Sequence, residues 1–177
     1  YYEESGRGPT LLFVHEFAGD YRSWEAQMRY FSRRYRCVAY SARGYLPSSV
    51  PESADDYSQW RVSEDIRCVL DALQVEKAHV VGLSMGAFAT FYFGMRWPER
   101  ALSLTLAGIG SGSMPEVRAQ FHAESEASAE SLLATGWEAN AEARTLTPTR
   151  VQLRNKDPRG FAEFVGHVRK QIGRAHV

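Results

Sequence analysis

Gly82-Leu83-Ser84-Met85-Gly86 is the stretch that decides the fold of this chain. The residues before it, Ala-His-Val-Val at 78–81, have the apolar composition of a buried strand, and residues 87–97 place apolar side chains at helical spacing. A serine between two glycines at such a strand-to-helix turn is the pattern of a nucleophile elbow. The tight turn favours glycine beside the serine and places the serine hydroxyl at a helix N-terminus, where backbone N–H groups stabilise an anion. The alternative is a tight turn that carries a passive serine.

The composition is that of a globular chain with no net charge. Its 177 residues can bury a core, and 21 basic residues balance 21 acidic ones, so no net field favours nucleic acid or an anionic membrane as a partner. No signal peptide and no apolar run of membrane-spanning length is visible. Cys37 and Cys68 lie in apolar-periodic segments, where we expect small buried hydrophobic residues rather than a disulfide, and this favours the cytoplasm.

Strand and helix patterns alternate along the first 110 residues. Apolar runs rich in β-formers predict buried strands, and amphipathic segments that begin near Asp20 and Ser58 predict helices between them. The expected strands are residues 10–17, 36–42, 78–84 and 101–109, and the expected helices are residues 20–31, 58–73 and 87–97. Such alternation predicts an α/β fold in which a parallel sheet carries helices on both faces.

The character of the sequence changes after Gly110. Residues 115–134 and 137–145 predict amphipathic helices, and Asp157-Pro158 predicts the capped start of another. The helices favour a lid, so we expect a core over residues 1–110 and a partial helical cap over 111–171. Residues 172–177 are those that a common sequencing-adapter string encodes, and the chain starts at Tyr1 without a methionine. We therefore expect a chain that is incomplete at both ends, with a tail of no biological meaning.

A second motif, His15-Glu16-Phe17-Ala18-Gly19, ends the first expected strand about seventy residues before the elbow. Together the two motifs resemble the α/β-hydrolase family, in which an H-G-x-x-G-like loop precedes the elbow. Residues 41–48, S-A-R-G-Y-L-P-S, resemble a third signature of that family, D-x-R-G-x-G-x-S. The resemblance covers residues 8–110 and implies a parallel α/β-hydrolase sheet followed by the start of a helical cap.

The resemblance also implies roles for single residues. Ser84 is the implied nucleophile, between the elbow glycines Gly82 and Gly86. The residue after the His-Gly pair and the residue after the nucleophile supply the two oxyanion-hole N–H groups in this family, which by position are Phe17 and Met85. The chemistry needs these donors because the tetrahedral intermediate develops a negative oxygen.

Several residues in these two loops need a separate interpretation. We expect His15 to organise the strand end rather than act as a base. Glu16 stands where the family has glycine, and a carboxylate aimed at the oxyanion would oppose its charge, so we expect Glu16 to point outward or the loop to differ. Ser41, Leu46 and Ser49 blur the third signature, and we interpret Arg43 as a surface loop residue.

A serine hydrolase also needs a base and an acid, which in this family follow the nucleophile in the order acid, then histidine. The downstream candidates are Asp157 and the histidines His122, His167 and His176. His122 and His167 lie in helical patterns rather than at strand ends, so we expect solvated helix residues. The triad acid and base are then absent from this chain, and we expect the chain by itself to be an inactive fragment with an exposed sheet edge.

The resemblance implies a cofactor-free enzyme that cleaves a small-molecule ester or lactone by acyl transfer through serine, as esterases and enol-lactonases do. Haloalkane dehalogenases and epoxide hydrolases share the scaffold but use a carboxylate nucleophile, so Ser84 argues against both. Two alternatives are open: a receptor that holds or slowly cleaves a ligand, and a cofactor-free haloperoxidase-type member. No metal cluster, nucleic-acid partner or membrane partner is expected, and the oligomeric state is open.

The aromatic residues of the expected lid allow two interpretations. Phe121, Trp137 and Phe161 either line an acyl pocket or pack the lid on its own core.

Overall fold

The computed structural model describes residues 1–170, apart from the side chains of residues 142–144 and 149. The chain divides into two compact units, Tyr1–Ile109 and Gly110–Val177. The strands are β1 (Tyr2–Ser5), β2 (Thr10–Val14), β3 (Arg36–Tyr40), β4 (Ala78–Leu83) and β5 (Ala101–Ala107). The α-helices are α1 (Glu25–Phe31), α2 (Gln59–Ala72), α3 (Met85–Arg96), α4 (Pro115–Thr145), α5 (Val151–Lys156) and α6 (Pro158–Arg169).

The five strands form one sheet in the order β1-β3-β2-β4-β5. Strand β1 pairs antiparallel with β3, and the other neighbours pair in parallel. The register sets Val14, the last residue of β2, opposite Gly82 near the end of β4. Because parallel strands end at the same edge of a sheet, the segments that follow β2 and β4 leave it side by side.

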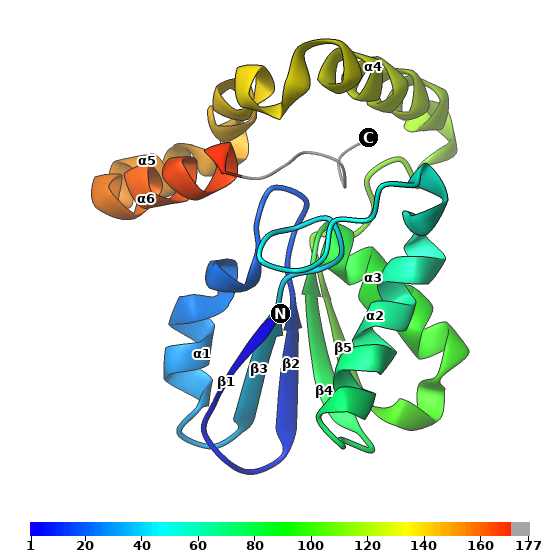
Figure 1. The fold of residues 1–177 in the computed structure, drawn as a ribbon, viewed down its shortest axis with the longest axis vertical. Helices are drawn as coiled ribbons and strands as arrows, with labels where there is room; N and C mark the ends of the chain where they lie inside the picture. Colours follow the sequence, from blue (N-terminus) through cyan, green and yellow to red (C-terminus); the bar gives the residue numbers. More distant parts are fainter. Residues whose placement is uncertain (171–177) are drawn as a thin grey trace. The chain divides into compact units, whose positions relative to one another are not determined.

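Helices cover both faces of the sheet, as the alternating pattern predicts (Figure 1). Helix α1 covers one face, where Phe13 of β2 stacks on Trp24 with 4.9 Å between ring centroids. Helix α3 packs on β4 and β5 and against α2. The predicted N-cap at Asp20 is confirmed, since Asp20 accepts a hydrogen bond from Arg22 N–H. Ser58, where a helix was predicted to begin, caps α2 by accepting a hydrogen bond from Arg61 N–H.

The described residues of the second unit form helices and the turns between them. Helix α4 is broken at Gly136, which has φ 79° and ψ 169°, so it consists of the two helices that the sequence predicts. Asp157 caps α6 by accepting a hydrogen bond from Gly160 N–H at 2.9 Å. The core of this unit contains Trp137, whose indole N–H donates to Val168 O at 2.5 Å.

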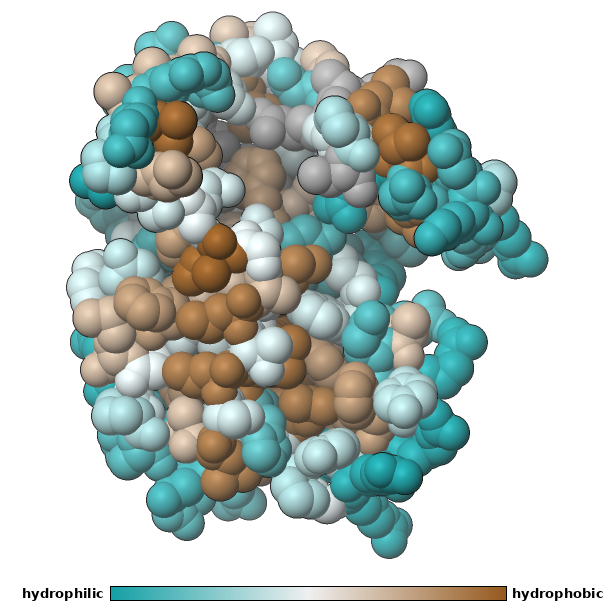
Figure 2. Space-filling view, turned by 180° about the vertical axis from the view of Figure 1, so that it is seen from behind, coloured by the Kyte–Doolittle hydropathy of each residue, from teal (hydrophilic) through white to brown (hydrophobic). Residues whose placement is uncertain are grey.

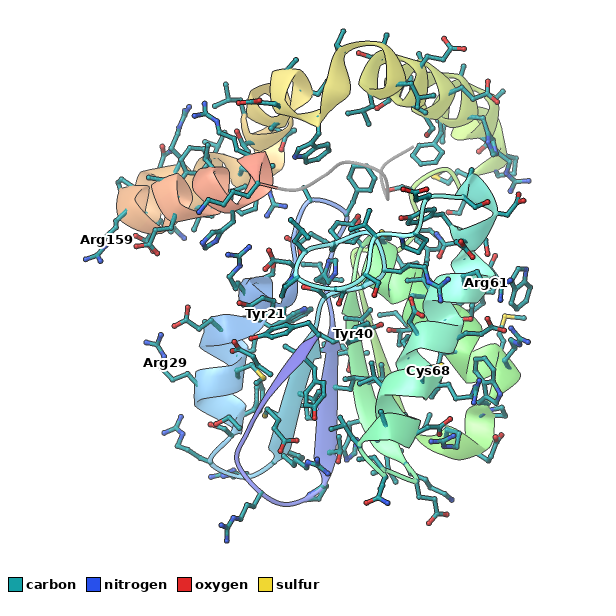
Figure 3. The ribbon with its side chains drawn as sticks, in the orientation of Figure 1. Tyr21, Arg29, Tyr40, Arg61, Cys68 and Arg159 are labelled. Atoms are coloured by element: carbon teal, nitrogen blue, oxygen red, sulfur yellow. The ribbon has the colours of Figure 1, made fainter. Side chains whose placement is uncertain are left out.

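Three features differ from the sequence-based expectation. Strand β1 was not predicted, and the parallel strands β2, β3 and β5 are each two or three residues shorter than their predicted ranges. Cys37 is buried as expected, but the expectation for Cys68 is wrong, because this residue of α2 is exposed (Figure 3). It lies on the solvent side of the amphipathic helix. Strand β5 lies at the edge of the sheet and has exposed apolar side chains, Leu102 (49% exposed) and Leu104 (37%), in keeping with the expected exposed sheet edge. Figure 2 shows brown apolar groups gathered on one face of the first unit.

Within the described residues, the search for a helix long and apolar enough to cross a membrane finds none.

Candidate active site

Ser84 occupies a strained turn between β4 and α3. Its φ of 53° and ψ of −114° are outside the regions that residues with a side chain readily adopt. The Ser84 N–H donates to Ala107 O of the neighbouring strand at 2.8 Å, and Ser84 O accepts the first bond of the helix, from Ala87 N–H at 2.9 Å. These two hydrogen bonds therefore hold Ser84 in the turn. A strained backbone conformation of this kind typically lowers the stability of the fold by about 1–3 kcal/mol.

The two elbow glycines are required by close backbone contacts. A Cβ on Gly82 would lie 2.2 Å from Gly86 O, and a Cβ on Gly86 would lie 2.2 Å from Val14 O. Both obstacles are main-chain atoms, which no change of rotamer can move. Glycine at these positions therefore lets α3 start directly against the ends of β2 and β4. These contacts agree with the prediction that the glycines make the turn tight.

His15 is fully buried, and both of its ring nitrogens have backbone partners. Nε2 accepts a hydrogen bond from Ala42 N–H at 3.0 Å, so the proton is on Nδ1, which donates to Glu16 O at 2.8 Å. Burial lowers the pKa of His15 below its usual value, and this outweighs the opposite effects of Glu16 and Asp20. A neutral imidazole with both nitrogens in use ties the end of β2 to the loop after β3, and it has no nitrogen left to act as a base for Ser84.

Glu16 is buried rather than turned toward solvent. Its Oε1 accepts a hydrogen bond from Ser23 Oγ at 3.3 Å, and an added Cβ on Gly19 would lie 2.7 Å from the carboxyl carbon. The carboxylate thus packs against Gly19 and Ser23, which belong to the loop and the 3-10 turn after β2. This is how the chain accommodates a carboxylate at a position where the family has glycine.

The loop after β3 is fixed by an ion pair. Arg43 donates two hydrogen bonds to Asp65 of α2, Nε to Oδ2 at 2.8 Å and Nη2 to Oδ1 at 2.5 Å, and a third to Asp56 O at 2.9 Å. Both side chains are about one-fifth exposed. The interpretation of Arg43 as a surface loop residue is therefore wrong, because its guanidinium joins this loop to a helix far away in the sequence.

Tyr45, in the same loop, is a residue whose role the sequence reasoning missed. It is 1% exposed, and its hydroxyl donates to Phe17 O at 2.7 Å and lies 3.5 Å from Met85 Sδ. Its ring meets the His15 ring edge-on, with 4.6 Å between centroids. The signal was present in the sequence, since an aromatic residue with a hydroxyl directly follows Arg43-Gly44 in the third motif.

The sheet brings the predicted site residues to one edge. Ser84 and Met85 follow β4, Phe17 follows β2 by three residues, and the neighbouring pairing of these strands sets the two segments next to each other. As the first residue of α3, Met85 has an N–H without an acceptor inside the helix. Ser84, Met85 and Phe17 are all partly exposed.

The described downstream histidines and Asp157 belong to the second unit. His122 lies on α4 and His167 on α6, both in the second unit, while Asp157 caps α6. His176 lies outside the described residues. His79 is at the opposite end of β4 from Ser84, and its Nδ1 is 2.8 Å from Ser103 Oγ. Among the described residues, no group of three or more His, Cys, Asp or Glu side chains is placed to hold a metal ion.

The geometry defines a class of protein: a mostly parallel α/β sheet with a serine on a strained strand-to-helix turn at its carboxyl edge. A family model for the alpha/beta hydrolase fold matches residues 9–166. This chain belongs to the alpha/beta hydrolase fold family.

Relatives of the chain have hydrolase names. It is 36% identical over 101 residues to epoxide hydrolase 1 of Caenorhabditis elegans, a match that covers 57% of this chain and 25% of that protein. It is 33% identical over 99 residues to 3-oxoadipate enol-lactonase 1 of Acinetobacter baylyi, covering 56% of this chain and 36% of the relative. A solved structure of a hydrolase from Pseudomonas aeruginosa matches with a TM-score of 0.77 and 26% identity, covering 99% of this chain and 65% of the other. The chain thus spans about a quarter to a third of the length of these two curated relatives.

Proposed function

We propose that the complete protein hydrolyses a small ester or lactone by acyl transfer to Ser84. The observation that carries the proposal is the backbone of Ser84, strained at φ 53° and held by Ala107 O and Ala87 N–H at the N-terminus of α3. A protein has no need of this strain for a passive turn, since glycine would adopt the same conformation without it. Strain kept at a serine therefore favours a chemical role for its hydroxyl.

The reaction needs donors for the negative oxygen that forms when Ser84 Oγ attacks the carbonyl carbon. Met85 N–H supplies one because it is the first N–H of α3, where the helix dipole also favours negative charge. Phe17 N–H supplies the other from the loop after β2, which the sheet places beside the elbow. Donors held in place before the reaction stabilise the transition state without a reorganisation cost.

The base and the acid of the triad lie outside the described residues in this proposal. His15 is excluded as a base because Nδ1 and Nε2 are both bonded to the backbone. In this proposal the helices of the second unit belong to a cap, and Trp137 packs within the core of that unit. We further place the protein in the cytoplasm, in keeping with two free cysteines, of which Cys68 is exposed.

The relatives named epoxide hydrolase make a second reaction worth testing beside the first. Those enzymes use a carboxylate nucleophile at the elbow, and this chain has Ser84 there. A serine attacking an epoxide would form an ether, which water does not readily cleave, whereas an acyl-serine ester hydrolyses. The nucleophile therefore favours an ester or lactone substrate over an epoxide.

The test uses the complete protein expressed from its full gene. A fluorophosphonate or sulfonyl fluoride label should attach to the peptide that contains Ser84, and p-nitrophenyl esters should be turned over. Ser84→Ala should lose both properties, with a fall in kcat of at least about a thousandfold, while the exposed Ser113→Ala should match the parent. Labelling without turnover would favour the receptor alternative, and turnover of styrene oxide that survives in Ser84→Ala would contradict the serine mechanism.

A further inference from the structure

Tyr45 contacts both residues that the proposed function uses as oxyanion donors. We propose that Tyr45 is a positioning residue, whose hydroxyl holds Phe17 and Met85 in the geometry that the oxyanion hole requires. The inference rests on the proposed function and adds a residue to it. It is carried by two contacts of one hydroxyl group, 2.7 Å to Phe17 O and 3.5 Å to Met85 Sδ.

The hydroxyl acts on Phe17 together with His15. The peptide between Glu16 and Phe17 carries the Phe17 N–H, and its carbonyl oxygen, Glu16 O, accepts the Nδ1–H of His15. In a trans peptide the C=O and the N–H point in opposite directions within one plane. Fixing the oxygen therefore fixes the direction of the Phe17 N–H, and a hydrogen bond at the oxygen also strengthens that N–H as a donor.

The next peptide, between Phe17 and Ala18, is held by Tyr45. Its carbonyl oxygen, Phe17 O, accepts the hydroxyl proton of Tyr45. With the peptides on both sides of its Cα tied to buried rings, Phe17 cannot rotate without breaking one of two hydrogen bonds. Those two rings also pack on each other, edge to face, at 4.6 Å between centroids.

The same hydroxyl reaches the other side of the site through Met85. Its oxygen lies 3.5 Å from Met85 Sδ, so the Met85 side chain is fixed beside the loop that follows β2. Met85 is the first residue of α3, and its N–H is the second proposed donor. One buried hydroxyl thus contacts residues that follow two different strands, β2 and β4.

The loop that carries Tyr45 is built to keep that hydroxyl in place. Gly44 N–H donates to Ser49 O at 2.9 Å, Ser48 Oγ donates to Ser41 O at 2.6 Å, and Arg43 is paired with Asp65. Tyr45 itself is 1% exposed, so water has little access to replace a lost bond. Because this loop holds Tyr45 in place, its hydroxyl can restrict the motion of the proposed oxyanion donors before the substrate binds.

The experiment compares Tyr45→Phe with a matched control in the complete protein. Tyr57→Phe is the control, because the Tyr57 hydroxyl also donates to a backbone carbonyl, Pro51 O at 2.9 Å, outside the proposed oxyanion hole. Removing a whole oxyanion donor costs about a hundredfold to a thousandfold in kcat, so loss of a positioning contact should cost about tenfold. Tyr45→Phe should show this fall in kcat on p-nitrophenyl esters with KM within about twofold, since ground-state binding is untouched. Tyr57→Phe should keep the parent kcat.

Two further measurements separate positioning from a structural role. Replacement of Tyr45 by 4-aminophenylalanine keeps a donor at the same place and should restore most of the lost kcat. The affinity for a trifluoromethyl ketone, which forms the oxyanion on Ser84, should fall in Tyr45→Phe by the same factor as kcat/KM. Both replacements keep the ring against His15, so both should fold, with melting midpoints close to that of Tyr57→Phe.

The outcomes distinguish this inference from the proposed function. An active parent whose kcat is unchanged in Tyr45→Phe would overturn the role of Tyr45 alone. A fall in kcat that follows a fall in melting midpoint, and that 4-aminophenylalanine does not restore, would also overturn it. A parent with neither labelling at Ser84 nor turnover would instead overturn the proposed function.

Discussion

Replacing Gly86 by alanine would place a methyl group against the main chain of β2. The added Cβ would lie 2.2 Å from Val14 O and 2.6 Å from His15 O, whereas ordinary van der Waals contact begins at 3.4 Å. Helix α3 would therefore have to move away from the end of β2 by about 1.2 Å, the difference between 2.2 Å and 3.4 Å. Because β2 is bonded on both sides, to β3 and to β4, it cannot yield without breaking the sheet.

The expected loss of stability follows from this displacement. Overpacking a core that can adjust costs about 1–3 kcal/mol, and a rigid backbone obstacle belongs at or above the upper end of that range. Alanine regains up to about 1 kcal/mol of helix propensity relative to glycine, which offsets part of the cost. We expect Gly86→Ala to lower the free energy of unfolding by about 3 kcal/mol. At an m-value of about 2 kcal/mol/M, the urea midpoint then falls by about 1.5 M.

Two other glycines provide matched controls for the same substitution, measured by urea unfolding with tryptophan fluorescence. In Gly94→Ala, also on α3, the new Cβ meets Leu104 Cδ1 at 2.2 Å, but that side chain is 37% exposed and can rotate away. In Gly166→Ala, on α6, nothing lies within 4 Å of the new Cβ. We expect a change below about 1 kcal/mol at Gly94 and a gain of about 0.5–1 kcal/mol at Gly166. A loss below about 1 kcal/mol at Gly86 would refute the argument that main-chain contact dictates glycine at the elbow.

Three further predictions concern the strain, the buried histidine and the ion pair. Ser84→Gly should raise the free energy of unfolding by about 1 kcal/mol, because glycine adopts the φ of 53° without strain. Ser84→Ala should leave the free energy of unfolding nearly unchanged. Equal urea midpoints for the two variants would contradict this prediction. Burial lowers the pKa of His15 from 6.5, so the unfolded chain binds this proton more readily than the folded chain does. The free energy of unfolding should therefore be independent of His15 above about pH 7 and should fall as the pH drops below 6.5. His15→Gln should flatten that part of a plot of urea midpoint against pH, and an equally steep plot would contradict the prediction. Asp65→Asn should lower the free energy of unfolding by about 1–2 kcal/mol, because it weakens the bidentate hydrogen bond from the partly buried Arg43. Glu25→Gln, in the exposed pair with Arg29 (Figure 3), should lower it by less than about 0.5 kcal/mol. Equal urea midpoints for the two variants would contradict the assignment of Arg43 and Asp65 as a stabilising pair.

The parts of the fold that the sequence predicts are those in which local pattern and burial agree. Strand β2 reads as a continuous apolar run because every one of its residues is buried between two helical layers. Strand β1 was missed because its residues, Tyr-Glu-Glu-Ser, are all exposed and polar or amphipathic, so its pairing with β3 leaves no apolar pattern. The break in α4 was predicted from composition, and Gly136 with its positive φ is the physical reason for it.

The residues of the candidate site also divide into those that a local pattern predicts and those that it does not. Ser84 and its two glycines form one local motif, and the contacts of the glycines are with the immediately adjoining turn and the end of β2, so a short pattern suffices to find them. Arg43 and Tyr45 act across longer distances, Arg43 on Asp65 and Tyr45 on Phe17, residues 22 and 28 positions away in the sequence. Nothing in the local pattern of their loop marks those partners, which are set only when β2 pairs within the sheet and α2 packs on it.

The hydrogen bonds of His15 connect the structural and the chemical parts of this site. The contact with Ala42 requires the neutral form, because Nε2 must accept from Ala42 N–H, whereas Nδ1–H donates to Glu16 O in either form. Protonation would put a proton on Nε2 and remove the bond to Ala42, which leaves two donors facing each other in a buried space. The peptide that carries the Phe17 N–H would then lose its support from the loop after β3. Acid should therefore weaken the proposed oxyanion hole through His15 in addition to any titration of a catalytic base, and the charge on this histidine has its effect on Phe17 rather than on Ser84.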